Sequence, residues 1–169
     1  MSEITLRHEI DTDEATYWSK CVFDADFNKK LYIDALKFPE WRLLDSKDDD
    51  AKLWRRVQVD PPVGNMPAAV KKVLGDKLSY VEEGTFDKKA KRYSFKVTPS
   101  TLAEKTKVSG EMWVEKLGDK KIARVTKMSV EVKVFMVGGL VEERILSDLK
   151  SSYDKGTVFT NQYIKENGL

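Results

Sequence analysis

The chain of 169 residues is long enough to form one domain with a substantial hydrophobic core. Its 30 basic and 28 acidic residues leave a net charge of +2, and the two signs are interleaved along the sequence. The densest basic run, Lys88 to Arg92, falls where a hairpin turn is expected, so the sequence lacks the basic stripe of a nucleic-acid-binding protein.

Cysteine content and hydropathy bear on the compartment of the protein. Cys21 is the only cysteine, which excludes an intrachain disulfide and gives no support for an oxidising compartment. The first ten residues lack the apolar segment of a signal peptide. The longest apolar run, Val134 to Val141, contains two glycines and is too short to span a membrane. We expect a soluble, cytoplasmic protein with no integral membrane association.

The first predicted elements are a strand followed by two short helices. Apolar residues alternate with polar ones from Ile4 to Ile10, the period of a strand with one covered face, and His8 falls on the covered side. Tyr17 to Val22 then fits a short helix preceded by N-cap candidates. A second short helix around Phe27 to Leu36 follows, and Pro39 ends it.

The middle of the chain is predicted to form antiparallel hairpins. Residues 41–44 and 53–59 are expected to pair across a loop that holds the aspartates 48–50. Residues 66–75 begin with an early proline and end with glycine, which predicts a short helix. Residues 77–86 and 91–97 form the next predicted hairpin.

A third hairpin is predicted between residues 101 and 135. The apolar residues of both its strands lie at even-numbered positions, so cross-strand partners on the same face must pair even with even. That register requires a turn of odd length, such as Gly118-Asp119-Lys120, whereas a two-residue Gly118-Asp119 turn would contradict it.

The last segment, Gly138 to Asn167, is predicted to be one long helix. Steps of about 100° per residue collect its apolar residues on one face. At about 1.5 Å per residue the helix is roughly 40 Å long, so its apolar face needs a broad partner. Because most of the preceding hundred residues are predicted to be β, that partner is a curved sheet.

This order of elements resembles the helix-grip fold of the START-like (SRPBCC) superfamily, which includes Bet v 1-type allergens, lipid-transfer START domains and polyketide cyclases. Local resemblance lies in residues 27–36, 67–83 and 137–166, and it is strongest to a bacterial branch of unknown function. The resemblance implies an α+β fold in which residues 1–169 form one domain. About six to seven antiparallel strands would wrap the C-terminal helix, with two short helices after the first strand.

In that superfamily a cavity between sheet and helix commonly holds lipids, sterols or aromatic compounds, and only some branches catalyse reactions. In this chain the expected lining consists of residues on the inward faces of the strands and of the long helix, namely Tyr93, Phe95, Met112, Met128, Val130, Leu149, Tyr153, Gly156 and Tyr163. Ordinary core packing is the alternative for each of them. The buried tyrosines favour a cavity, because a buried phenol needs a hydrogen-bond partner.

Three other residues, and Gly156 of the expected lining, allow two interpretations each. His8 is either a core histidine or a group that contacts ligand and transfers protons. Arg124 either extends to solvent or holds a ligand carboxylate or phosphate. Glu142 either belongs to the buried stripe or complements the helix dipole from the first turn. Gly156 either permits close approach of a strand or leaves room for ligand.

The sequence contains no phosphate-binding loop, nucleophile motif or metal-ligand spacing, so no cofactor and no metal are expected. The first functional hypothesis is non-enzymatic binding or transport of a hydrophobic, lipid-like or aromatic small molecule. The second is a cyclase or hydrolase in which His8 and a buried tyrosine act as acid and base. The third is a protein-interaction module with a filled core. The first two hypotheses differ in whether His8 and a tyrosine hydroxyl meet in one cavity.

Overall fold

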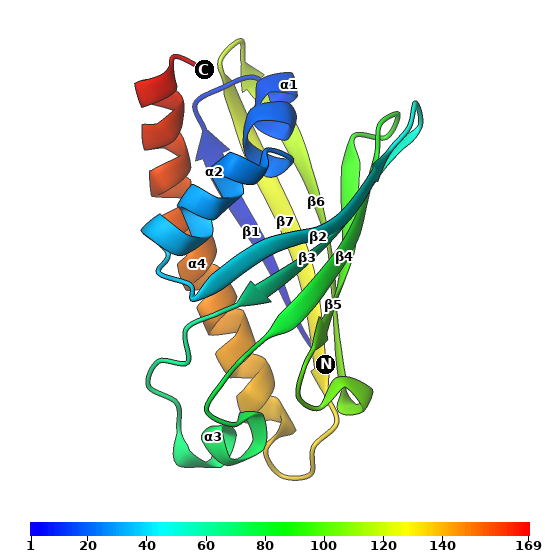
Figure 1. Ribbon diagram of the computed structural model, residues 1–169, viewed down its shortest axis with the longest axis vertical. Coiled ribbons are helices and arrows are strands. Elements are labelled where there is room, and N and C mark those ends of the chain that lie inside the picture. Colours follow the sequence, from blue (N-terminus) through cyan, green and yellow to red (C-terminus); the bar gives the residue numbers. More distant parts are fainter.

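A seven-stranded antiparallel sheet wraps around a long C-terminal helix in the computed structural model, which describes residues 1–169 (Figure 1). The strand order is β1-β7-β6-β5-β4-β3-β2, so the first two strands of the chain form the two edges. This arrangement confirms the predicted α+β helix-grip architecture.

Six of the strands form three sequential hairpins. They are β2 (Glu40–Asp48) with β3 (Lys52–Asp60), β4 (Tyr80–Asp87) with β5 (Arg92–Pro99), and β6 (Thr106–Gly118) with β7 (Lys121–Val132). The first strand, β1 (Ser2–Ile10), pairs with β7, and His8 lies opposite Arg124. Because cross-strand partners share a face, His8 and Arg124 point to the same side of the sheet.

The β6–β7 hairpin has the predicted register but a different turn. Val114 pairs with Arg124 and Lys116 with Ile122, which confirms the even-to-even pairing. The turn itself has two residues, because Gly118 pairs with Lys121, so the predicted three-residue loop is wrong. A bulge at Leu117 adds one residue to β6 and offsets the even length of the turn.

Between β1 and β2 the chain forms the two predicted short helices, each of which widens into a π-helix. They comprise α1 (Glu14–Thr16) with η1 (Tyr17–Val22), and α2 (Ala25–Lys29) with η2 (Lys30–Ala35). Asp13 and Asp24 cap them by accepting backbone hydrogen bonds of 2.9 and 2.8 Å. In Figure 1 this segment lies between the C-terminal helix and the β2–β3 hairpin, and both neighbours contact it.

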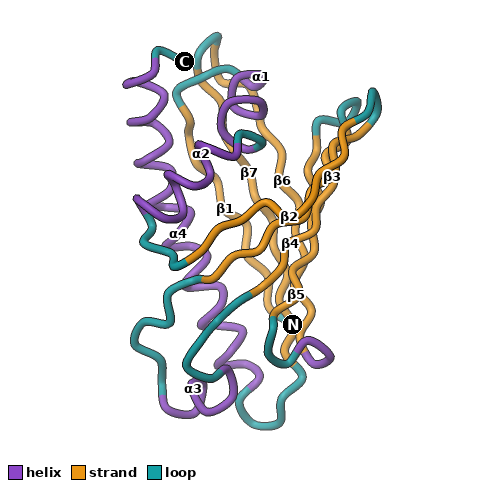
Figure 2. The backbone as a smooth tube through the Cα atoms, viewed as in Figure 1, coloured by secondary structure: helices purple, strands orange, loops and turns teal.

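The C-terminal helix α4 spans Gly138–Asn167, as the periodicity predicted, and packs against β1, β7 and η2. Its first residue must be small, because a Cβ on Gly138 would lie 2.3 Å from the carbonyl oxygen of Val132. The short helix α3 (Ala68–Leu74) and the 3₁₀ turn η3 (Ala103–Lys105) lie toward the end of the molecule where α4 begins. Several of the longer loops gather at this same end (Figure 2).

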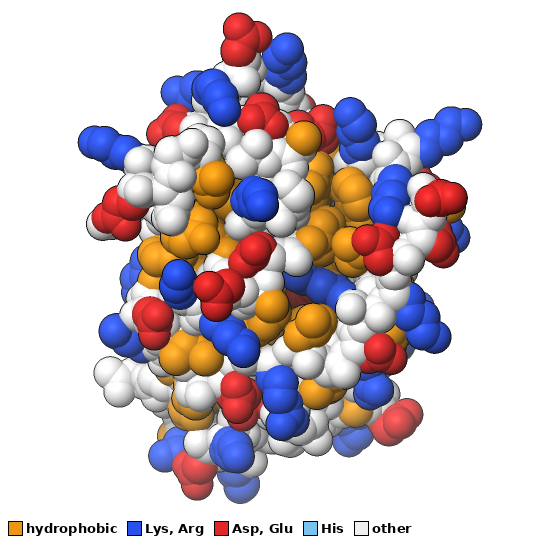
Figure 3. All heavy atoms as spheres, turned by 45° about the horizontal axis from the view of Figure 1, so that its top comes forward, with side chains coloured by type: hydrophobic (Ala, Val, Ile, Leu, Met, Phe, Trp, Pro, Cys, Tyr) orange, Lys and Arg blue, Asp and Glu red, His pale blue; other side chains and the backbone are white.

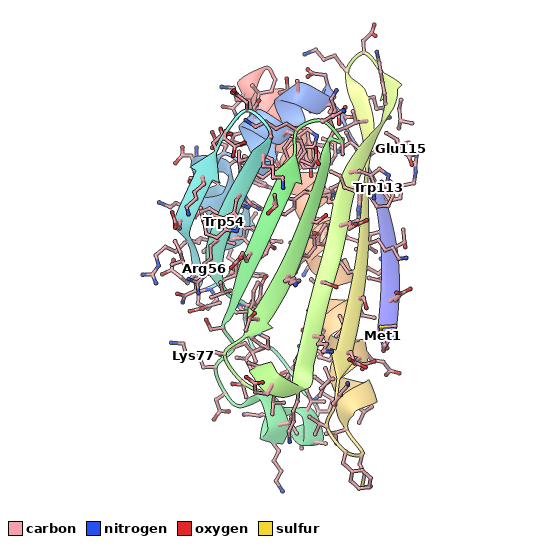
Figure 4. The ribbon with its side chains drawn as sticks, turned by 90° about the vertical axis from the view of Figure 1, so that its right-hand side faces the viewer. Met1, Trp54, Arg56, Lys77, Trp113 and Glu115 are labelled. Carbon is pink, nitrogen blue, oxygen red and sulfur yellow. The ribbon has the colours of Figure 1, made fainter.

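The alternation of the strands separates an inner from an outer face of the sheet. Figure 4 shows Trp54, Arg56, Trp113 and Glu115 on the outer face. Their sequence neighbours therefore point inward, and one of these is the charged residue Arg55. The inner face supplies most of the hydrophobic core, which includes Tyr93, Phe95 and Met112 from β5 and β6. None of the helices has both the length and the hydropathy needed to cross a membrane.

Candidate ligand-binding cavity

A cavity of about 260 Å³ lies between the inner face of the sheet, α4 and the helices after β1. It is lined by 31 residues, 19 of them hydrophobic, so its interior is mainly apolar. Its volume is close to the lower end of the roughly 300–1,000 Å³ found for small-molecule sites. In Figure 3 hydrophobic side chains gather around a hollow in the middle of the surface, inside a rim of charged residues.

Five of the six tyrosines of the chain line the cavity, namely Tyr17, Tyr32, Tyr80, Tyr93 and Tyr153. Burial raises the pKa of the Tyr153 phenol to about 12 and raises the pKa of Tyr32, Tyr80 and Tyr93 as well. These four phenols are therefore neutral at physiological pH. The hydroxyls of Tyr32, Tyr80 and Tyr153 can each donate one hydrogen bond, whereas that of Tyr93 already donates to Glu82.

One polar cluster of the lining joins Arg55, Glu82 and Tyr93. The Tyr93 hydroxyl donates to Glu82 Oε1 over 2.7 Å and accepts from Arg55 Nε at 3.1 Å. Arg55 Nη2 lies 3.6 Å from the same carboxylate oxygen, so the two charges compensate each other. Gly84 makes room for this arrangement, because a Cβ there would lie 2.1 Å from the Tyr93 hydroxyl. Arg55 Nη1 also donates to the Val22 carbonyl oxygen over 2.6 Å, so the cluster is neutral and joined to the end of η1.

The second polar group of the lining is Arg124, whose residue surface is only 7% exposed. Its guanidinium donates to the Tyr17 hydroxyl at 3.3 Å, to Thr157 Oγ1 at 2.9 Å and to the Tyr153 carbonyl at 3.5 Å. It also lies over the Tyr153 ring, 4.8 Å from the centroid. Burial and these contacts show that Arg124 does not extend to solvent.

His8 points to the inner side of the sheet but lies outside the cavity lining. Its Nε2 is 2.7 Å from Asp154 Oδ1, and its ring stacks on Tyr153 with 6.3 Å between centroids. This hydrogen bond is the largest cause of the lowered pKa of the Asp154 carboxyl, with a second contribution from Lys150. Tyr153 both lines the cavity and contacts His8, but His8 itself is not a lining residue.

The structure brings eight of the predicted site residues to the cavity. They are Tyr93, Phe95, Met112, Arg124, Met128, Leu149, Tyr153 and Gly156. Three others lie outside its lining: His8, Val130 and Tyr163. Val130 is fully buried in the sheet between β1 and β6, where it belongs to the packed core. Tyr163 packs edge-on against Phe27, with ring centroids 5.0 Å apart, just beyond Thr160, the last lining residue of α4.

Two further interpretations are corrected by the geometry. No strand closely approaches Gly156, because the nearest atom to a Cβ placed there is Cδ1 of Leu31, at 3.4 Å. Glu142 does not lie in the first turn of α4, so it does not act as a first-turn dipole partner. Its buried carboxylate instead accepts hydrogen bonds from the Val132 backbone at 2.8 Å and from Ser2 Oγ at 2.6 Å.

Sequence reasoning missed several lining residues, above all Arg55 and Glu82. Arg55 shares the inward face of β3 with Val57 and Val59, and Glu82 shares that of β4 with Tyr80. Strand alternation therefore contained the signal. A charged residue on the apolar face of a strand indicates either a buried ion pair or a ligand-binding site. Arg55 and Glu82 therefore belong among the residues expected to line the cavity.

The comparisons place this architecture in a family. The model of a family described as "Protein of unknown function (DUF2505)" matches residues 5–164. The chain belongs to this family. No curated protein matches the sequence significantly.

Solved structures share the fold of this DUF2505 protein at low sequence identity. A START superfamily protein from Mycobacterium smegmatis is 13% identical, with a TM-score of 0.64 over 95% of this chain and 98% of that one. The Zhui aromatase/cyclase from Streptomyces sp. R1128 is 8% identical, with a TM-score of 0.70 over 99% and 96%. Norcoclaurine synthase from Thalictrum flavum, in complex with dopamine and hydroxybenzaldehyde, is 14% identical, with a TM-score of 0.63 over 98% and 87%. These likenesses confirm the START-like fold.

Proposed function

We propose that this DUF2505 protein binds or transports a hydrophobic small molecule, lipid-like or aromatic, in the cavity between the sheet and α4. The observation that carries the proposal is an internal, mainly apolar space with a few inward polar groups. Each 100 Å² of apolar ligand surface buried there contributes about 2.5 kcal/mol, at roughly 25 cal/mol per Å². The tyrosines and Arg124 supply the hydrogen bonds that orient the polar end.

The ligand would enter where the loop before α3 meets α4. Pro61 and Leu74 line the cavity near this loop, and Ile145 of α4 lines it as well. Arg144 fastens the loop to α4 by donating to the carbonyl oxygens of Asn65 and Val63. Entry would require these hydrogen bonds to open, because they hold the loop over the cavity.

The first experiment looks for ligand that copurifies with the protein. Purified native protein is extracted with organic solvent, the extract is analysed by mass spectrometry, and binding of an uncharged fluorescent probe, N-phenylnaphthylamine, is titrated. We expect probe binding that Gly156→Leu weakens, because the new side chain enters the cavity. Val158→Leu is the matched control, since Val158 lies on the exposed face of the same helix. An empty extract together with no probe binding would contradict the proposal.

The enzymatic alternative required His8 and a tyrosine hydroxyl in one cavity. His8 is not a lining residue, and its Nε2 is already bonded to Asp154. That mechanism therefore lacks its proton carrier, and binding is the function that the geometry favours. The interaction-module alternative required a filled core, which a cavity of about 260 Å³ does not favour.

A further inference from the structure

Arg124 carries the one uncompensated charge among the residues that line the cavity. Four charged residues line it: Arg55, Glu82, Arg124 and Asp148. Arg55 pairs with Glu82 at 3.6 Å, and Asp148 pairs with Arg144 at 2.7 Å. Arg124 forms no ion pair, and all its protein partners are neutral oxygens and the Tyr153 ring. The charges of the four lining residues sum to zero, but Asp148 is paired with Arg144, which lies outside the lining, so Arg124 is left without a charged partner.

A buried guanidinium without a carboxylate is energetically costly. Arginine does not deprotonate in proteins, so the charge cannot be removed by loss of a proton. Burial of a charge without a partner of opposite sign is strongly unfavourable, and a ring face with neutral oxygens compensates it only in part. The contacts to Tyr17 and to the Tyr153 carbonyl are long, at 3.3 and 3.5 Å, so a better acceptor can replace them.

Unsatisfied polar atoms gather around the same residue. Four buried side-chain polar atoms in the protein have no hydrogen-bond partner, and three of them are Arg124 Nε, Thr126 Oγ1 and His8 Nδ1. His8 lies opposite Arg124 in the β1–β7 pairing, and Thr126 is the next inward residue of β7. Arg124 Nε is a charged hydrogen-bond donor, and the Thr126 hydroxyl, which also contacts the Tyr153 phenol, can donate or accept, so an acceptor is missing beside the guanidinium.

We propose that Arg124 is the anchor for an oxyanion, and that the ligand is an anionic amphiphile with a carboxylate or phosphate head and an apolar tail. This inference rests on the proposed function and specifies its ligand class. The head would lie at Arg124, because a planar guanidinium binds carboxylate and phosphate oxygens in pairs. The tail would occupy the apolar lining toward Met112 and Leu149.

The test compares ligands that share a tail and differ in the head. Decanoic acid, decyl phosphate and decanol are titrated at neutral pH by displacement of N-phenylnaphthylamine. We expect at least one acid to bind the wild-type protein about tenfold more tightly than decanol, and the two acids distinguish a carboxylate site from a phosphate site. In Arg124→Met this preference should be lost, whereas decanol should bind equally well or better.

Arg7→Met is the matched control, because it removes one arginine from the outer face of β1, where Arg7 pairs with Glu115. It should leave the acid preference unchanged. If wild-type protein binds decanol and both acids within about twofold of each other, the anion site is refuted and the proposed function stands. If no compound binds or displaces the probe, the proposed function fails as well. The wild-type comparison decides the matter even where Arg124→Met does not fold.

Discussion

Replacing Gly156 by alanine tests why a glycine lies in the middle of the longest helix. The change adds one methyl group at the cavity wall. Alanine is favoured over glycine inside a helix by about 1 kcal/mol. Against this gain stands one contact, between the new Cβ and Cδ1 of Leu31 at 3.4 Å, which is at the edge of ordinary van der Waals distance. Leu31 is a flexible side chain and can shift slightly at little cost.

We therefore expect Gly156→Ala to raise the free energy of unfolding by about 0.5–1 kcal/mol. For a chain of this size that corresponds to a rise in Tm of roughly 1–4 °C. The assay is thermal and urea denaturation followed by circular dichroism. The matched control is Gly139→Ala, in the first turn of the same helix, where a Cβ meets no atom within 4 Å.

Binding gives the second part of this test. Gly156 lines the cavity and Gly139 does not. Gly156→Ala should therefore weaken binding of N-phenylnaphthylamine, and Gly139→Ala should leave it unchanged. A gain in stability with weaker binding would mean that the glycine is retained for space. A loss of stability above about 0.5 kcal/mol would refute this reasoning, because it would show that the wall around Leu31 cannot accept one methyl group.

Three further predictions concern buried groups. Cys21 is fully buried, and burial is the main reason why the pKa of its thiol is raised to about 12. Iodoacetamide should therefore label the native protein at pH 8 far more slowly than the protein unfolded in urea. Equal labelling rates would contradict this burial. Hydrogen bonds from Ser2 and the Val132 backbone hold the pKa of Glu142 below 4.5, so its stabilisation is full above that pH and is lost as the pH falls through the lowered value. The stability difference between wild type and Glu142→Gln, from urea titrations, should accordingly shrink on acidification, and a constant difference from pH 7 to pH 3 would be the wrong result. Thr157→Glu should place a carboxylate beside Arg124, since Thr157 Oγ1 is 2.9 Å from Nη2. It should lower the affinity for decanoic acid about tenfold and change the affinity for decanol little. The control Thr157→Gln should leave the affinity for decanoic acid near that of the wild type.

Long periodic segments were the part of the fold that sequence could predict. The bounds of α4 follow from thirty residues of helical period, and the even register of β6 and β7 follows from alternation over more than ten residues on each side. Averaging over many residues makes such patterns robust. The bulge at Leu117 is a single-residue event, and no period reveals it. The same holds for the π-helical widening of η1 and η2, which spans only six residues in each.

The sequence could predict a lining residue only where the orientation of its side chain follows from one helix or one strand alone. Tyr153 and Leu149 follow from the face of one helix, and Met112 and Met128 from single strands. The Arg55–Glu82 pair depends on how β3 aligns with β4, which no local pattern specifies. The position of His8 likewise depends on a contact between β1 and α4, in which His8 stacks on Tyr153, and of these two residues Tyr153 lines the cavity.

The two inward arginines separate the contribution of charge from that of packing. Each guanidinium lies over a tyrosine ring, at 5.3 Å for Arg55 and Tyr93 and at 4.8 Å for Arg124 and Tyr153. Each also bonds a phenol, at 3.1 Å and 3.3 Å. Each also donates to a backbone carbonyl oxygen, that of Val22 for Arg55 and that of Tyr153 for Arg124. The carboxylate of Glu82 is the charged partner that only Arg55 has. If neutral partners alone were enough to bury an arginine in this cavity, Glu82 would be dispensable, and Glu82→Gln would leave stability unchanged. If Glu82→Gln instead lowers the free energy of unfolding in urea titrations, a buried arginine here needs a carboxylate, and at Arg124 the head group of the proposed ligand would supply it.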